Sequence, residues 1–156
     1  MKYERYVDLT VTEDFMEYEF TSTGPKGNIV KIVQFSQTER EGLINLAFGN
    51  KLKDGSIDDL ARDHNGDRNK ILATVVTVLK TYFKVYPFNW VFFAGSSSAR
   101  TRLYRMAITL NFEELEAEFE ILGVLEEFNF FPNVPFAKGI DYFGFLVRPK
   151  KLKFDI

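Results

Sequence analysis

Hydrophobic and polar residues alternate along the first third of the chain, the pattern of strands with one buried face. Residues 18–20 and 29–35 alternate in this way on either side of residues 23–28, where glycine and proline supply the geometry of a turn. Similar stretches at residues 6–11 and 43–48 predict two further strands. The N-terminal third is therefore predicted to be an antiparallel meander.

A helical period replaces this alternation in the middle of the chain. Apolar side chains recur there at spacings of three and four, at Ile71, Leu72, Val75, Val78, Leu79, Tyr82, Phe83 and Tyr86. This spacing predicts one long helix, which Asp67 caps and Pro87 ends. In the preceding linker, Ser56 and Asp59 are spaced as a capping box, so we expect a short helix over residues 57–63.

One uniformly apolar strand and a second helix follow. Residues 90–94 are too uniformly apolar for an exposed edge and predict a central strand. Ser97 or Ser98 then caps a helix over residues 99–110, and the acidic residues 112–119 are suited to extend it.

Two closing strands are predicted over residues 119–125 and 141–147. An aromatic loop at residues 129–139, which contains two prolines, separates them. Together the elements predict a single α+β domain over residues 1–156. Its sheet is twisted and mixed, with an antiparallel meander followed by helix, strand, helix, strand and strand.

Composition excludes several classes of chemistry. The chain has no cysteine and one histidine, which excludes a disulfide scaffold, a thiolate nucleophile and a metal centre built from cysteine or histidine clusters. His64 has Asp63 and Asp67 beside it, but such groups in a polar loop are ordinary surface residues, so no metal is predicted. The formal net charge of −2 provides no general attraction to nucleic acid or to anionic membranes.

The two ends of the sequence lead us to expect a cytoplasmic protein without a membrane or nucleic-acid partner. Residues 1–5 are charged, and no apolar stretch long enough for a signal peptide or a membrane span follows them. The basic residues 148–153 have no aromatic platform beside them, which indicates a solvated terminus rather than a nucleic-acid contact.

Phenylalanine is unusually abundant, with 17 residues in a chain of 156. Several fall in the C-terminal third, at Phe128, Phe130, Phe131, Phe136, Phe143 and Phe145. A domain of this size is not expected to bury all of them, so an aromatic surface for a small protein partner is predicted here.

The turn after residues 90–94 carries the strongest local signal for a binding site. Gly95 is followed by Ser96, Ser97, Ser98, Arg100, Arg102 and Arg105. Backbone N–H groups at a helix start, hydroxyls and guanidinium groups together favour a phosphate or carboxylate. Residues two apart on a helix diverge by about 200°, so of the arginines only Arg102 and Arg105 share a face. The alternative is that the arginines are solvated and pair with acidic residues at 113–116.

This second helix resembles the corresponding helix of the GNAT acyltransferase superfamily, which carries the motif N-x-x-A-x-x-L-Y-x-x-x-G-F. Leu103 and Tyr104 match its leucine and tyrosine, and Ser97 and Arg100 fall at its asparagine and alanine. The element order is also similar, since that superfamily has a pyrophosphate-binding helix, a splayed strand, the leucine–tyrosine helix and two strands. The resemblance implies that Tyr104 is a general acid that protonates the departing thiolate of a thioester.

The same resemblance implies acetyl-CoA or another acyl-CoA as cofactor. In that superfamily a loop R/Q-x-x-G-x-G/A grips the pyrophosphate ahead of the first helix; in residues 63–68 Gly66 matches, and Arg68 stands at the final small position. The cofactor-binding residues so implied are Gly66, Arg68, Ser96, Ser97, Ser98 and Arg100. A general base is left open among Glu39, Glu41 and Asp58.

The whole chain also resembles a set of small uncharacterised bacterial proteins that share the stretch G-S-x-x-A-R-T-R-L-Y, here residues 95–104. Two functions are therefore considered. The first is a degenerate GNAT-like domain that binds acyl-CoA weakly or transfers an acyl group to an amine. The second is a non-catalytic interaction module, such as one member of a bacterial toxin–antitoxin pair, which would use the aromatic loop and the basic helix face.

Overall fold

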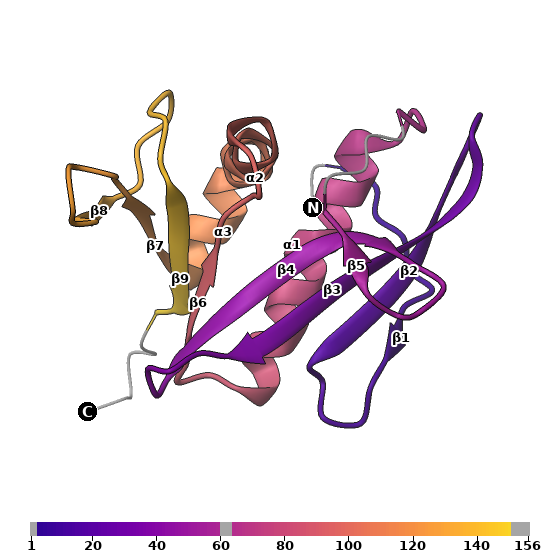
Figure 1. The fold of residues 1–156 in the computed structure, drawn as a ribbon, viewed down its shortest axis with the longest axis horizontal. Coiled ribbons are helices and arrows are strands. Elements are labelled where there is room, and N and C mark those ends of the chain that lie inside the picture. The colour runs from indigo at the N-terminus through magenta and orange to yellow at the C-terminus, as the bar shows by residue number, and fades with distance from the viewer. Residues whose placement is uncertain (1–2, 60–63, 151–156) are drawn as a thin grey trace.

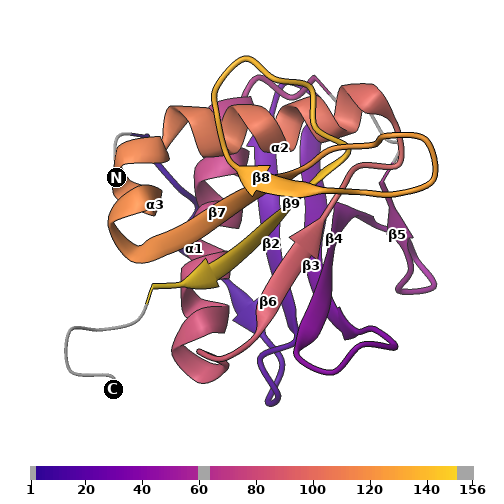
Figure 2. The ribbon, with the colours of Figure 1, turned by 90° about the vertical axis from the view of Figure 1, so that its left-hand side faces the viewer.

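The computed structural model describes residues 3–59 and 64–150. Within these ranges the chain forms one open mixed sheet of nine strands together with three helices (Figures 1 and 2). The predicted α+β class and the mixed sheet are confirmed. Among the described helices, none is long and apolar enough to cross a membrane.

The N-terminal meander is also confirmed. It comprises β1 (Thr10–Val11), β2 (Glu17–Gly24), β3 (Gly27–Gln37) and β4 (Leu43–Lys51), each antiparallel to the next. The β2–β3 hairpin closes on a two-residue turn between Gly24 and Gly27. Gly27 has a φ of 91°, which a residue with a side chain rarely adopts, so the glycine is required by the turn.

The first strand is shorter than the predicted stretch at residues 6–11, because Tyr6 contacts the long helix instead of the sheet. Its N–H donates to the Thr74 hydroxyl at 2.8 Å, and its own hydroxyl donates to the Asp67 carboxylate. Its ring stacks on Phe20 at 5.6 Å between centroids. The chain therefore joins the sheet only after it has crossed the start of this helix.

The segment after β4 contains a strand where a helix was predicted, and this prediction is wrong. Gly55, with a φ of 87°, reverses the chain, and β5 (Ile57–Asp58) pairs antiparallel with the end of β4. The Ser56 hydroxyl donates to the Asp54 carboxylate at 2.5 Å, so the serine stabilises this turn instead of capping a helix. Residues 60–63 lie outside the described part of the chain.

The long helix is confirmed as α1 (Arg68–Val85), and it ends just before Pro87, as predicted. It buries its apolar face against the meander, where the Tyr82 ring stacks on Phe35 with 4.0 Å between centroids. Asp67 occupies the residue before the helix, but its side chain makes no capping hydrogen bond. Its carboxylate is used elsewhere, as described below.

The C-terminal half completes the sheet. Its elements are β6 (Trp90–Phe93), α2 (Ser98–Leu110), α3 (Phe112–Glu118), β7 (Phe119–Val124), β8 (Asn133–Pro135) and β9 (Gly144–Pro149). The strand order is β1-β2-β3-β4-β6-β9-β7-β8, and β5 joins β4 off this path. Of the described strand pairs, β4 and β6 are parallel and the others are antiparallel.

The aromatic loop predicted at residues 129–139 contains the short edge strand β8. This strand pairs with β7 on one side, and its other side is the edge of the sheet. The Pro132 carbonyl accepts from the N–H of Leu125, just after β7, and the N–H of Phe136 donates to Ile121 of β7. By the alternation of a strand, the backbone groups of Asn133 and Pro135 therefore face outward. The closing strand β9 begins at Gly144, later than residue 141, where it was predicted.

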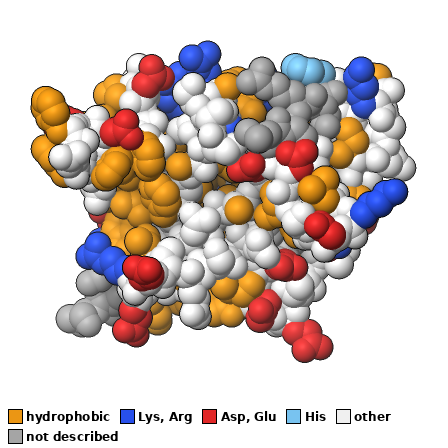
Figure 3. Space-filling view, in the orientation of Figure 1, with side chains coloured by type: hydrophobic (Ala, Val, Ile, Leu, Met, Phe, Trp, Pro, Cys, Tyr) orange, Lys and Arg blue, Asp and Glu red, His pale blue; other side chains and the backbone are white. Residues whose placement is uncertain are grey.

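The helix-free face of the sheet differs between its two halves. Apolar side chains gather over β6, β7, β8 and β9, whereas charged and polar groups are interspersed over β2, β3 and β4 (Figure 3). The apolar half is the more informative for function.

Candidate functional site

The two long helices begin at the same end of the sheet, where β2, β4 and β6 end (Figure 1). The strands β4 and β6 are paired only from Leu43↔Trp90 to Asn45↔Phe92, after which β4 continues without β6. Asn50 near the end of β4 pairs with Lys31 of β3 on one side and with Asp58 of β5 on the other. Thus β5 occupies the same edge of β4 that β6 leaves.

The contact between β5 and β4 is tight at Gly49. A Cβ atom placed on this glycine would lie 2.5 Å from the Asp58 carbonyl oxygen and 2.7 Å from a methyl of Ile57. Glycine is therefore required for β5 to lie against β4. Because the backbone edge of β4 is in use here, a bound ligand cannot pair with it at this point.

The serine turn is built mainly by local hydrogen bonds. The Ser97 hydroxyl accepts from the N–H of Arg100 at 3.2 Å, so Ser97, rather than Ser98, caps α2. The Thr101 hydroxyl donates to the Ser97 carbonyl and accepts from the N–H of Gly95 at 3.0 Å. A Cβ atom at Gly95 would lie 2.4 Å from the Thr101 nitrogen, so this glycine lets the strand meet the helix.

These contacts explain part of the stretch at residues 95–104 without a ligand. Gly95, Ser97 and Thr101 have structural roles in the strand-to-helix turn. Ser96 and Ser98 are exposed, and their hydroxyls make no hydrogen bond within the ranges that the structure describes. They are the hydroxyls of this turn that face solvent.

Two of the three arginines bind groups of the protein itself. The Arg100 Nε donates to the Asp59 carbonyl at 2.5 Å. Arg105 forms an ion pair with Asp141 and donates to the Ile140 carbonyl at 3.0 Å, so its predicted pairing with residues 113–116 is not observed. Arg102 is exposed. An anion was expected to bind at this turn. The Arg100 side chain is instead directed to the backbone next to β5.

Tyr104 lies one turn after Arg100, and only 4% of its surface is exposed. Its ring packs edge-on against Phe93 at 5.3 Å between centroids. Burial raises the pKa of its hydroxyl well above the ordinary value of 10.0, although the nearby Arg100 charge opposes this effect. The phenol therefore keeps its proton at neutral pH, as a general acid must before it acts.

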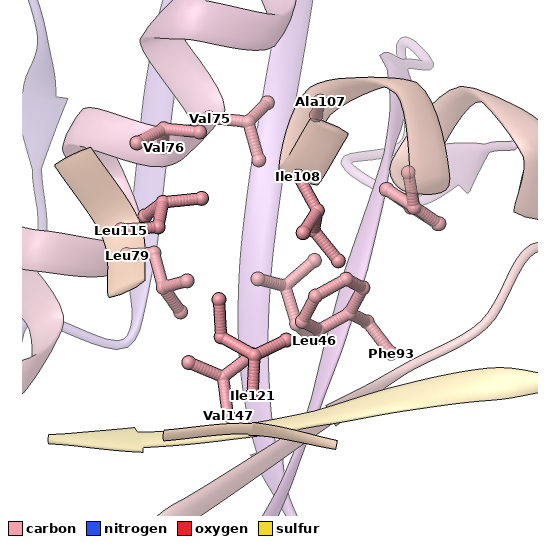
Figure 4. A pocket seen from close by; sticks show the side chains of 11 residues that line it. Leu46, Val75, Val76, Leu79, Phe93, Ala107, Ile108, Leu115, Ile121 and Val147 are labelled. Atoms are coloured by element: carbon pink, nitrogen blue, oxygen red, sulfur yellow. The ribbon is translucent and has the colours of Figure 1, made fainter. Parts of the chain in front are cut away.

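Tyr104 also borders a small cavity of about 30 Å³ in the core. The other lining side chains are apolar and come from the helices and from the sheet. They include Val75 of α1, Ile108 of α2 and Val147 of β9 (Figure 4). A cavity of this size holds about one or two waters at most, and an apolar lining leaves it dry. It has no room for the acyl chain of a thioester.

The loop before α1 is bound to the β2–β3 hairpin. The Asp67 carboxylate accepts hydrogen bonds from the hydroxyls of Ser22 and Tyr6. Asn65 is buried, accepts from the N–H of Lys26 at 2.7 Å and donates to Ser22 at 3.0 Å. The protein therefore places its own carboxylate beside the positive end of α1, where a diphosphate was expected.

The predicted cofactor residues fall into two groups. Gly66, with a φ of 78°, and the exposed Arg68 belong to the loop that the hairpin holds. The serines and Arg100 belong to the turn after β6. Of the possible general bases, Asp58 lies in β5, near Arg100, whereas Glu39 and Glu41 lie in the turn at the opposite end of β4.

One buried charged residue was missed by the sequence analysis. Lys31 is only 6% exposed, and its ammonium group donates to the Asn50 side chain at 2.5 Å. It sits at an inward position of the alternating stretch 29–35, directly across from the core residue Phe20. That position was the available signal, because a lysine in the inward series of a strand is rarely buried without polar partners.

No group of three metal-binding side chains occurs within residues 3–59 and 64–150. His64 is exposed and has a φ of 50°. Its neighbour Asp67 is engaged with Ser22 and Tyr6, and Asp63 lies outside the described residues.

Hydrophobic side chains gather on the surface of the C-terminal half (Figure 3), and ring contacts identify an aromatic surface among them. We call it the aromatic face and define it by Trp90, Phe92, Phe131 and Phe143. The Phe143 ring lies 4.9 Å from Phe131 and 6.4 Å from Phe92, and the Arg148 guanidinium lies 4.4 Å over Trp90. Phe131 and Phe143 are 48% and 43% exposed. The aromatic surface was predicted from the phenylalanine content, but its contribution from β6 was not.

Comparison with known proteins gives a family but no characterised relative. Residues 2–150 match the model of a family described as a family of unknown function, DUF6934. No curated protein and no solved structure matches the chain.

Proposed function

Since the chain belongs to DUF6934, a family of unknown function, we propose a function from the geometry: a non-catalytic domain of GNAT-like topology that binds a protein partner. The observation that carries this proposal is the aromatic face. Its Phe143 ring packs against Phe92 and Phe131, and both Phe131 and Phe143 remain exposed to solvent.

Such a surface is suited to binding a protein. Contiguous apolar patches on a soluble domain mark interaction sites more often than isolated exposed residues do. Burying one such ring at an interface contributes roughly 1.5–3 kcal/mol, and aromatic residues are enriched among the anchors of interfaces. Trp90 and Phe92 of this face lie in β6 of the central sheet, so this part of the face is held by the sheet and loses little entropy on binding.

The topology supports the GNAT-like part of the proposal. The parallel strands β4 and β6 diverge after three paired positions, and α1 connects them. The helix α2 carries Leu103 and Tyr104, and β7 and β9 follow it. This is the order of helix, splayed strand, helix and two strands that the resemblance implies.

The contacts at the helix starts favour loss of catalysis. The edge of β4 is paired with β5, Arg100 is bonded to the Asp59 carbonyl, and Asp67 brings negative charge to α1. An acyl-CoA in the usual position of that superfamily would have to displace these bonds. Each bond to a charged group contributes about 1.5–3 kcal/mol, so the displacement would weaken binding strongly.

Site-specific photo-crosslinking tests the interaction. We expect a benzoylphenylalanine at position 131 or 143 to capture one recurrent protein, and the same group at position 88 to capture none. Phe88 is the matched control, because it is 95% exposed but lies in the turn between α1 and β6. The captured protein, once purified, should bind at least about fivefold more weakly to the Phe143→Ser variant. Equal capture at the three positions would contradict the proposal.

Acyl-CoA binding is the second candidate, and Tyr104 favours it, because its protonated phenol lies one turn from Arg100. Calorimetry with CoA and acetyl-CoA tests it: a heat of binding that Arg100→Ala reduces and Arg102→Ala leaves unchanged would support this candidate. Loss of acyl transfer in Tyr104→Phe would identify the acid. A null titration at high CoA concentration would reject both roles.

A further inference from the structure

The hairpin that leads into β8 holds a phenylalanine at its tip. The N–H of Glu127 bonds to the Phe130 carbonyl at 3.0 Å, and the N–H of Phe130 bonds to the Glu127 carbonyl at 2.9 Å. Phe128 and Asn129 therefore form a two-residue turn. Phe128 has a φ of 51° and is 99% exposed.

This conformation is costly for Phe128. A left-handed backbone costs a residue with a side chain roughly 1–2 kcal/mol, and glycine or asparagine is the usual occupant of such a turn. Within the described chain the ring of Phe128 buries almost nothing that could offset this cost. Strain that no internal contact compensates is typical of positions kept for function.

The charges around the tip are unbalanced. Glu126 and Glu127 are exposed, and neither carboxylate has an ion pair among the described residues. Three cations of this half of the molecule are directed elsewhere. Arg105 pairs with Asp141, Arg148 pairs with Glu120, and Lys138 lies over the Phe112 ring at 5.5 Å.

We propose that Phe128 is the anchor of the interface and inserts into an apolar pocket of a partner protein whose rim carries lysine or arginine. Glu126 and Glu127 then pair with that rim. This inference rests on the proposed interaction function and specifies the chemistry of the partner. A second copy of the chain is a poorer occupant, because a symmetric contact centred on the hairpin would oppose the carboxylates of the two copies.

Synthetic peptides test this chemistry. The probes are three fluorescent amphipathic helices with the same leucine face and with lysine, glutamine or glutamate on the other face. We expect the lysine peptide to bind most tightly, with an affinity that falls as salt is raised. Phe128→Ala should weaken its binding at least about fivefold. Glu126→Gln with Glu127→Gln should remove the preference for lysine over glutamine.

Matched variants control for general effects. Phe88→Ala removes an equally exposed ring from another turn, and Glu4→Gln with Asp8→Asn removes two exposed carboxylates near the N-terminus. Both should bind like the wild type. Equal or absent binding of the three peptides, or unchanged binding by Phe128→Ala, would overturn the inference.

The outcomes separate this inference from the function on which it rests. If Phe143→Ser weakens peptide binding and Phe128→Ala does not, the aromatic face binds partners but the hairpin is not its anchor. If neither Phe128→Ala nor Phe143→Ser weakens peptide binding and crosslinking at positions 131 and 143 fails, both proposals fail. A dimer in sedimentation equilibrium that Phe128→Ala dissociates would assign the hairpin to a second copy and overturn the proposed partner.

Discussion

At the scale of single residues, the core contains a polar group without a partner. Tyr18 is fully buried beside Phe35, and its hydroxyl makes no hydrogen bond within the described residues. Tyr82 is buried nearby, but its hydroxyl accepts from the Asn89 side chain at 3.0 Å. The same chemical group is therefore unsatisfied at one position and satisfied at the other.

This difference predicts opposite effects of the same substitution. Tyr18→Phe should raise the free energy of unfolding by about 1 kcal/mol, because the variant no longer buries an unsatisfied hydroxyl. Tyr82→Phe should lower it by about 1 kcal/mol, because the Asn89 donor loses its acceptor. Urea denaturation of both variants measures the two changes. A loss of stability in Tyr18→Phe would mean that its hydroxyl has a partner in solution.

Predictability from sequence also depends on the residue. The inward series of residues 29–35 was correct, since Val33 and Phe35 are core residues, and it includes Lys31, whose burial was not predicted. The partner of Arg105 could not be predicted, because Asp141 lies far along the chain and meets it only in the fold. Local pattern specifies which face a side chain takes, whereas long-range pairs depend on the topology.

At the scale of elements, the three adjacent serines at the start of α2 have different structural roles. Ser97 accepts from the Arg100 N–H, whereas the hydroxyls of Ser96 and Ser98 lack such a bond in the part of the chain that is described. The sequence left open whether Ser97 or Ser98 is the cap, because both precede the helix by a suitable distance. The backbone angles of Ser97, which are extended, decide it.

Alanine substitutions at the three positions should therefore differ. Ser97→Ala should lower the free energy of unfolding by about 1 kcal/mol, the usual cost of removing a helix cap. Ser96→Ala and Ser98→Ala should stay within about 0.5 kcal/mol of the wild type. Thermal and urea unfolding provide the comparison. If all three variants lose equal stability, the cap has been misassigned.

The elements that the sequence predicted are the long periodic ones. The meander, α1 and α2 follow from alternation and from the helical period over many residues. The strand β5 could not be predicted, because it has two residues and depends on the turn at Gly55 and on the free edge of β4. This short strand determines how the candidate cofactor site is closed, so the site was less predictable than the fold.

At the scale of the whole molecule, three buried phenols link stability to alkaline pH. Burial raises the pKa of Tyr18, Tyr82 and Tyr104 above the ordinary 10.0, and the effect is largest for Tyr18 and Tyr104. Above that pH the unfolded chain releases protons that the folded protein retains. The stability is therefore fully present below about pH 10 and falls as the pH rises toward the folded-state values.

The expected slope is about 1.4 kcal/mol per pH unit for each group. Urea denaturation of the wild type from pH 8 to pH 11, chosen to span the ordinary tyrosine pKa of about 10, measures the fall. In the double variant Tyr18→Phe with Tyr104→Phe, the free energy of unfolding should fall less steeply with pH above about pH 10, by about twice this slope. An unchanged slope in the double variant would show that these two phenols ionise as readily in the folded protein as in the unfolded chain.

The position of Pro135 in the outermost strand has a consequence for self-assembly. The edge strand of an open sheet has unpaired backbone N–H and C=O groups, to which a strand of another copy can pair. Repeated pairing of this kind leads to fibres. Here β8 is only three residues long, and Pro135, one of its two outward-facing residues, has no N–H to donate. This edge of the sheet therefore resists the addition of strands from other copies, although the exposed aromatic face lies in the same half of the molecule.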